Sequence, residues 1–252
     1  MGSLTEASTL PYWQVNVPPE EREEECPSFL LSAKGKDVEI LGTPDSEYKR
    51  MTWPELQGHI SRNRLDIFQR TPIELRRYFA FNYEIKKKYG SIMNFVLGEK
   101  LHWEHPIVAD GEPFEKDSDL SIKRNDWPYG IDERISHLVV WTKFPLEEDP
   151  TTGGDSRTFP ASLPETVSRV EPAQEDPTTG GDLSDRQRKQ IDDYVEKTFR
   201  VQCGSDNVIW FRNWAALKSV HSVEHFHVML FNADQKFLDS ITGGDVPISE
   251  TV

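Results

Sequence analysis

Helix signals gather early in the chain and strand signals gather late, and this order constrains the fold more than any other feature. The segments TWPEL and TPIEL each begin with a threonine, Thr52 or Thr71, that is followed by a glutamate three positions on. This spacing is typical of the capping box at a helix N-terminus. Apolar and aromatic residues then recur at helical spacing, so the second helix is expected to run to about Tyr89 and to end at Gly90.

The second half of the chain is rich in β-branched and aromatic residues, which favour strands. Strands are predicted in ISHLVVWTKF, DNVIWFRNW and SVEHFHVMLFN, and further helices in SIMNFVLGEKL and SDRQRKQIDDYVEKTF. Helices followed by strands are typical of an α+β fold. We therefore expect N-terminal helices packed on a small, mainly antiparallel sheet.

Charge divides the chain into regions. Residues 1–48, with three basic and ten acidic groups, are interpreted as an acidic N-terminal flank that is partly disordered, although Tyr12 and Trp13 can dock on the body. Residues 49–252 are interpreted as a single α+β domain, interrupted by a disordered acidic loop at about 146–183. That loop holds the octapeptide EDPTTGGD twice and has few apolar side chains to bury.

Several classes of function are disfavoured by composition. The chain has no apolar run of about 18 residues and no secretory signal, so no membrane partner is expected. Two cysteines suit a reducing compartment, and a cytoplasmic location is expected. Because no P-loop or other Gly-rich phosphate loop occurs, neither an ATP site nor another cofactor is expected. The net charge of -14 disfavours a DNA partner, and nothing in the sequence sets the oligomeric state.

Two histidines alternate with apolar residues in SVEHFHVML. On a strand, His225 and His227 share one face at a separation of about 7 Å, while Phe226 and Val228 share the other face, which is expected to be the core. The pair can act in catalysis, bind a metal, or only form hydrogen bonds at a half-buried face. A catalytic metal needs three protein ligands, and the spacing supplies no third, so no metal site is predicted.

The preceding strand carries a similar pattern. The same alternation puts His137, Trp141 and Lys143 on one face of that strand. If this face coincides with that of the histidine pair, a polar and aromatic surface covers an apolar sheet.

Two carboxylates have neighbours that suggest a role. Asp126, with Trp127 and Tyr129 in the turn NDWPYG, offers a carboxylate beside aromatic faces, which suits a guanidinium group, although a turn of this kind needs no function. Glu224 points to the face opposite the histidines, where a carboxylate needs a partner such as Lys218.

Residues 49–90 carry ten basic and four acidic groups. They form either the solvated face of two amphipathic helices or a surface that contacts nucleic-acid phosphates. The candidate phosphate contacts are Arg62, Arg64, Arg76, Arg77, Lys86, Lys87 and Lys88.

Three blocks carry a family resemblance: TPIELRRYFAFNYEIKKKYGSIMNFVL, NDWPYGIDERISHLVVWTKF and NVIWFRNWAALKSVHSVEHFHVML. Together they resemble a fungal family of arginine-containing cyclodipeptide synthases, formerly described as N-acetylglucosamine-induced proteins of unknown function. The resemblance covers roughly residues 50–144 and 184–232. It implies an aminoacyltransferase that condenses arginine, from Arg-tRNA, with the amino acid of a second aminoacyl-tRNA to a cyclo(Arg-Xaa) diketopiperazine. The second amino acid is left open, with an aromatic one as an option.

The residues fit such a reaction in the following roles. We expect His225 or His227 to be the base, with Glu224 beside them, and Ser219 and Ser222 are candidate nucleophiles by proximity alone. The substrate-binding candidates are Asp126, Trp127, Tyr129, His137, Trp141, Lys143, Trp210 and Lys218. The basic helices would hold tRNA phosphates. Two alternatives stay open: a non-enzymatic, N-acetylglucosamine-responsive regulatory protein, and a histidine-dependent hydrolase.

Overall fold

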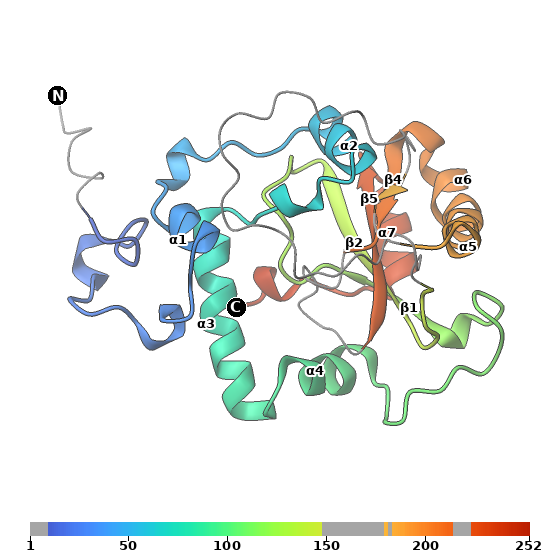
Figure 1. The fold of residues 1–252 in the computed structure, drawn as a ribbon, viewed down its shortest axis with the longest axis horizontal. Helices are drawn as coiled ribbons and strands as arrows, with labels where there is room; N and C mark the ends of the chain where they lie inside the picture. The colour runs from blue at the N-terminus through green and yellow to red at the C-terminus, as the bar shows by residue number, and fades with distance from the viewer. Residues whose placement is uncertain (1–9, 148–178, 181–182, 214–222) are drawn as a thin grey trace.

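The computed structural model describes residues 10–147, 179–180, 183–213 and 223–252, and has a central sheet with helices on both faces (Figure 1). Helices α2 and α3 lie on one side of the sheet, and α5 and α6 lie on the other. The α+β class predicted from the order of helix and strand signals is confirmed.

Four antiparallel strands make up most of the sheet. These are β1 (Leu120–Arg124), β2 (Ile135–Thr142), β4 (Val208–Phe211) and β5 (Glu224–Phe231), and the order across the sheet is β1-β2-β5-β4-β3. The short strand β3 (Thr179–Gly180) adds a parallel pairing at the β4 edge. β2 and β5 therefore occupy the centre, paired over eight residues each.

The N-terminal helices begin and end where local signals place them. α2 (Trp53–Ser61) starts with the capping box of Thr52 and Glu55, and α3 (Pro72–Tyr89) starts at Thr71 and ends at Gly90, which has a φ of 77°. A positive φ suits glycine at a helix C-terminus, because glycine has no Cβ. Before them lies α1 (Lys36–Leu41), and after them come α4 (Ile92–Phe95) and a π-helix (Val96–Leu101).

The later helices cover the second face of the sheet. They are α5 (Asp185–Val195), a π-helix (Glu196–Arg200), α6 (Val201–Cys203) and α7 (Gln235–Thr242). Short 3₁₀ helices occur at Pro19–Glu21, Ser28–Leu30, Asp45–Glu47, Leu65–Ile67, Asp117–Asp119, Ser205–Asn207 and Ile248–Glu250. Strand β1 and helices α1 and α7 were not predicted from the sequence.

Alternate residues of the strands pack into two hydrophobic cores, one on each face of the sheet. Phe226 and Val228 of β5 pack with Ile191 and Val195 of α5 on one face. Met229, the next residue along, packs on the other face with the residues of α2. Each large apolar side chain buried in this way contributes about 1.5–3 kcal/mol relative to its exposed state. Both faces of the sheet are thus sealed by helices.

This arrangement corrects one expectation. His225 and His227 do share the face opposite Phe226 and Val228, but that face is not a surface over an apolar sheet. The two histidines are only 4% and 5% exposed, because helices cover this face as well.

The acidic N-terminal flank is described from residue 10 onward and packs on α3. Tyr12 and Trp13 join a cluster with Leu30, Leu41 and Leu75. Most of the acidic loop predicted at about 146–183 lies outside the described residues. Its two ends meet, since the Ser184 amide N donates to the Glu147 carbonyl O at 3.1 Å.

The last residues of the described chain return to the centre of the molecule. The backbone N–H of Ile248 donates to Asp126 Oδ1 at 3.1 Å, and Arg77 donates to the carbonyls of Ser249 and Val252. This C-terminal segment, Ile248–Val252, is therefore anchored to both α3 and the turn that precedes β2. None of the described helices combines the length and the apolar character needed to cross a membrane.

Candidate functional site

The histidine face is assembled by the pairing of the two central strands. His225 lies opposite Trp141, His227 opposite Val139, and His137 opposite Met229. Because these positions alternate on both strands, all three histidines point to the same side of the sheet. The sequence left open whether the face of His137 coincides with that of His225 and His227, and the structure confirms that it does.

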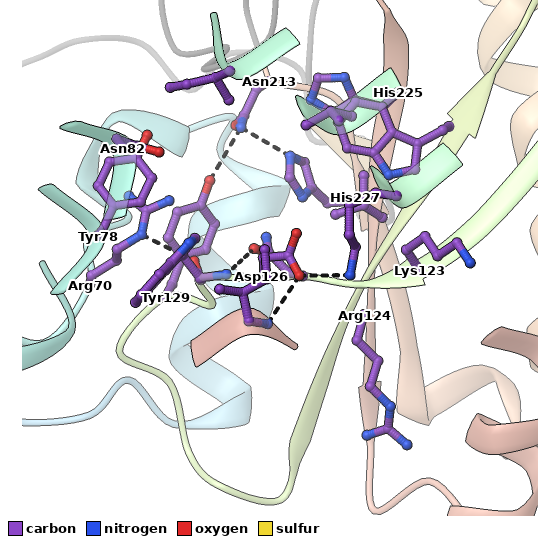
Figure 2. Close-up of a pocket in the computed structure, with 18 of the residues that line it drawn as sticks. Arg70, Tyr78, Asn82, Lys123, Arg124, Asp126, Tyr129, Asn213, His225 and His227 are labelled. Atoms are coloured by element: carbon purple, nitrogen blue, oxygen red, sulfur yellow. Dashed lines mark hydrogen bonds and ion pairs between the residues drawn. The ribbon is translucent and has the colours of Figure 1, made fainter. Parts of the chain in front are cut away.

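Polar side chains on this face form one hydrogen-bonded chain. Asn125 Nδ2 lies 3.0 Å from His137 Nε2, which lies 2.9 Å from His227 Nδ1. His227 Nε2 in turn lies 3.1 Å from Asn213 Nδ2, which donates to Tyr129 Oη at 3.2 Å. Figure 2 shows Asn213 between Tyr129 and His227. Residues from two strands and two loops thus hold each other in place.

The network determines which ring nitrogen carries each proton. Asn125 Oδ1 accepts from the Trp127 backbone N–H, so Asn125 Nδ2 is a donor and His137 Nε2 must accept. His227 Nδ1 faces the same atom, and its Nε2 accepts from Asn213. A ring nitrogen has one lone pair, so Asn125 and His227 share it in a bifurcated contact, and His137 carries its proton on Nδ1, a buried atom with no partner among the described residues.

Both network histidines are held in the neutral form. Burial, with a further contribution from the charge of Arg70, lowers the pKa of His137 to about 3. Burial, followed by the charges of His137, His225 and Arg70, lowers the pKa of His227 well below its ordinary value. The protein therefore keeps uncharged imidazoles, which are proton acceptors, in a buried site.

His225 has its own tautomer restraint. Its Nδ1 lies 2.9 Å from the Val223 carbonyl O, which can only accept, so Nδ1 carries a proton. The ring lies against Trp141, with the ring centroids 4.5 Å apart. His225 is thus held in one orientation.

A cavity of about 270 Å³ opens beside this network. His225, His227 and Asn213 line one wall, and α3 and α4 supply Tyr78, Asn82 and Phe95 on another. The charged lining residues are Arg70, Lys100, Lys123, Arg124 and Asp126, so cations outnumber carboxylates. The cavity can thus hold a polar ligand between imidazoles, aromatic rings and positive charges.

Asp126 sits in an ion cluster at the edge of the cavity. Lys100 Nζ lies 2.9 Å from Asp126 Oδ1 and 2.8 Å from Asp245 Oδ1. Burial raises the pKa of Asp126, an effect that Lys100 opposes. The described residues give Asp126 Oδ2 no hydrogen bond, so one carboxylate oxygen remains available to a ligand.

The cavity brings together part of the substrate-binding set predicted from the sequence. Asp126, Trp127, Tyr129 and Trp141 line it, and His137 lies behind it in the network.

The other members of the set lie elsewhere. Lys143 Nζ lies 5.6 Å from the ring of Trp103, while Trp210 is buried on the opposite face and donates to Asp192 at 3.1 Å. Glu224 pairs with Arg212 at 3.0 Å, and the partner suggested from the sequence, Lys218, lies outside the described residues. Ser219 and Ser222 also lie outside them.

The basic residues proposed to contact phosphates divide into two groups. Arg76 donates to the Trp13 carbonyl, Arg77 pairs with Glu74, and Arg64 pairs with Asp66, so these arginines already have protein partners. The second group, Arg62, Lys86, Lys87 and Lys88, is exposed, and Arg64 is exposed as well despite its pairing with Asp66. Lys87 also contacts Glu84 at 3.0 Å.

Several lining residues were missed by the sequence analysis. Arg70, Asn82, Lys100, Lys123, Arg124 and Asn213 all line the cavity. They come from α3, β1, the π-helix and loops, and no local motif links them. In the described part of the chain, no group of three or more His, Cys, Asp or Glu side chains is arranged to hold a metal ion.

Comparison with known proteins shows two relatives from yeasts. The chain is 30% identical over 212 residues to "N-acetylglucosamine-induced protein 1" of Candida albicans, covering 77% of this chain and 73% of the relative. It is 24% identical over 203 residues to an uncharacterized protein of Saccharomyces cerevisiae, covering 79% and 88%. A crystal structure of a protein named HTC1 has a TM-score of 0.53 at 20% identity, covering 77% of this chain and 96% of that one. That similarity concerns the fold alone.

The family model that matches is described as a protein of unknown function, DUF3605, and it spans residues 52–231. The name of the Candida albicans relative agrees with one part of the expected family resemblance, namely the description as N-acetylglucosamine-induced proteins. The assignment to a family of cyclodipeptide synthases is wrong, because neither the family description nor the relatives indicate such a family. The chain belongs to the DUF3605 family of proteins of unknown function.

Proposed function

We propose that the protein is an aminoacyltransferase that joins arginine to a second amino acid as a cyclic dipeptide, both amino acids being delivered as tRNA esters. The observation that carries the proposal is a cavity that combines a neutral imidazole, His227, and an oriented one, His225, with a carboxylate and several cations. An ester bond to tRNA is already activated, so the reaction needs a base, positioning and stabilisation of an oxyanion.

The cavity has a suitable size and lining. Its volume of about 270 Å³ is close to the lower limit of small-molecule pockets, about 300 Å³, which suits an aminoacyl group better than a whole nucleotide. The ring of Tyr78, on which Arg70 already stacks at 3.8 Å, illustrates how these aromatic walls hold a guanidinium. Asp126 Oδ2 would accept from the guanidinium of the substrate arginine.

His225 is the base in this proposal. Its Nδ1 proton is held by Val223, and so Nε2 would remove a proton from the α-ammonium group of the first ester. The free amine attacks the carbonyl carbon of the second ester, His225 gives its proton to the departing ribose oxygen, and the new amide nitrogen releases its surplus proton to solvent. The second α-ammonium group loses a proton to His225 in the same way, and its amine attacks the first ester, whose ribose oxygen departs with that proton. Two aminoacyl-tRNAs thus give one cyclic dipeptide, two tRNAs and two protons.

The direct test uses purified protein with Arg-tRNA and a mixture of aminoacyl-tRNAs, followed by mass spectrometry for cyclo(Arg-Xaa). The wild type is expected to form product, while His225→Gln and His227→Gln are expected to lose most of it. His59→Gln is the matched control, because His59 lies on α2 and does not line the cavity. Product formation that survives both cavity substitutions in folded protein would rule out the histidine assignment.

Two other results would overturn the transferase. Release of free amino acid without cyclic product would indicate a histidine-dependent hydrolase. Unchanged aminoacyl-tRNA would indicate a non-enzymatic binding or regulatory protein, as the N-acetylglucosamine-induced relative leaves open.

The tRNA contact is tested separately by the salt dependence of binding. Replacing Lys86, Lys87 and Lys88 of α3 by glutamine is expected to weaken binding and to make the dependence on salt shallower, by about 0.7–0.9 for each phosphate that the protein no longer neutralises. Lys189→Gln is the matched control, since this exposed lysine lies on α5, across the sheet. An unchanged slope would show that the lysines of α3 do not contact phosphates.

A further inference from the structure

Arg70 has an unusual environment for a side chain that lines a cavity. Its Nε donates to the Trp127 carbonyl O at 3.1 Å, and its guanidinium carbon lies 3.8 Å from the centre of the Tyr78 ring. These two contacts fix the plane of the guanidinium. Among the described residues, no carboxylate lies within ion-pair distance of Arg70, and its two terminal nitrogens have no hydrogen-bond acceptor.

Trp127, whose carbonyl holds Arg70, has an indole N–H without an acceptor. The residue is 4% exposed, lines the same cavity, and its Nε1 has no partner in the described part of the chain. The ring packs between Tyr78 and Phe81, with centroid distances of 6.0 and 5.5 Å. A buried donor that lacks an acceptor costs about 1–3 kcal/mol. A ligand that supplies an acceptor would recover this energy.

The charge of the cavity favours an anionic acceptor. Lys100 is balanced by Asp126 and Asp245, and Arg124 pairs with Asp239 at 3.0 Å. Of the charged residues that line the cavity in the described ranges, Arg70 and Lys123 are the cations without an ion pair. Figure 2 shows Arg70 beside Tyr78, on the opposite side of Asp126 from Lys123. Arg70 acts electrostatically on Asp37 without forming an ion pair with it, so the Arg70 side combines a cation that lacks a close carboxylate with an unpaired buried donor.

We propose that Arg70 and Trp127 form an oxyanion-binding subsite that takes a carboxylate or phosphate group of the cavity's ligand. The planar fork of the arginine presents two parallel donors that match two oxygens of either group, and the indole N–H adds a third donor. Burial is the largest cause of the lowered pKa of His137 and His227, and the positive charge of Arg70 adds to it; the same charge opposes the rise that burial causes in the pKa of Tyr129, so Arg70 lies near all three. A group bound by Arg70 therefore lies near the imidazole network. This subsite does not depend on the aminoacyl-transfer reaction.

The indole N–H gives a direct reading of occupancy. We suggest titrating isotope-labelled protein separately with acetate and with inorganic phosphate, at constant ionic strength, and following the indole N–H resonances by NMR. The chain has seven tryptophans, so Trp127→Phe, which keeps an aromatic ring, identifies the resonance of Trp127. That resonance is expected to shift downfield and to saturate with at least one anion. The anion with the stronger response identifies the ligand group as a carboxylate or a phosphate.

Two substitutions distinguish specific binding of the anion by Arg70 and Trp127 from nonspecific electrostatic attraction. Arg70→Lys keeps the charge but removes the fork, and is expected to weaken binding about tenfold or more. Lys123→Gln, which removes the other unpaired cation, is expected to change the affinity far less. A Trp127 resonance that responds to neither anion, or an equal loss of affinity in both variants, would overturn the proposal. Since no tRNA is present, the outcome is independent of the transferase assay.

Discussion

Replacing His137 by glutamine tests the claim that the network histidines are neutral because they are buried. In the native protein the single lone pair of His137 Nε2 is shared between Asn125 and His227. The Oε1 atom of glutamine occupies nearly the position of an imidazole Nε2 and can accept from both donors. The substitution therefore removes a titrating group while keeping the hydrogen-bond acceptor.

The magnitude follows from the difference in pKa between the folded and unfolded states. The pKa of His137 falls from 6.5 to about 3 on folding. Below pH 6.5 the unfolded chain takes up a proton that the folded protein does not bind until about pH 3, so His137 lowers the free energy of unfolding as the pH falls through this window. At about pH 4.5 the loss is about 3 kcal/mol, from about 1.36 kcal/mol for each of two pH units.

The assay is urea unfolding of the wild type and of His137→Gln at about pH 7.5 and about pH 4.5. The wild type is expected to lose about 3 kcal/mol more on acidification than the variant does. The carboxylates are common to both proteins, and burial, the largest cause of the lowered pKa of His227, is kept in the variant, so the difference between the two losses reports mainly on His137. Equal losses in the two proteins would refute the assignment of a buried, neutral His137.

Three further predictions concern stability, each measured by urea unfolding. Thr71→Ala removes the oxygen that accepts from the Glu74 backbone N–H and is expected to cost about 1 kcal/mol, while Thr71→Ser should cost much less. Gly130→Ala places a Cβ against the Tyr48 ring and hydroxyl and is expected to cost about 1–3 kcal/mol, a loss that should shrink when Tyr48→Ala is added. Asp119→Ala leaves two backbone N–H groups without their buried acceptor and is expected to cost about 3 kcal/mol, more than Asp119→Asn. A loss below about 0.5 kcal/mol, the usual range for substitutions at unconstrained surface sites, would contradict the corresponding prediction.

Local features of the fold could be predicted from the sequence. The ends of α3 were placed correctly because Thr71 and Gly90 determine them through contacts within one turn of helix. Strand parity likewise placed His225 and His227 on one face, because it depends only on regular alternation. In contrast, β1 was missed, since LSIKR is short and carries two charges that weaken the strand signal.

The candidate site was predictable only in part, for a different physical reason. Its residues meet through long-range pairing: the register of β2 with β5 brings His137 to His227, 90 positions apart. Asn213 and Arg70 reach the cavity from loops, where no periodic pattern marks them. The sequence also could not reveal that helices bury the histidine face, and this burial lowers the pKa of two of its imidazoles.

The anchored C-terminal segment has a practical consequence for engineering the protein. Ile248 forms part of the cavity wall, and its backbone N–H holds the same Asp126 oxygen as Lys100. Arg77 donates to the carbonyl of Val252, so a purification tag or fluorescent protein fused after Val252 is expected to disturb this contact and, through it, the cavity wall at Ile248. Fusions and surface-immobilisation handles are better placed before Leu10, where the described chain begins on the outside of the molecule (Figure 1).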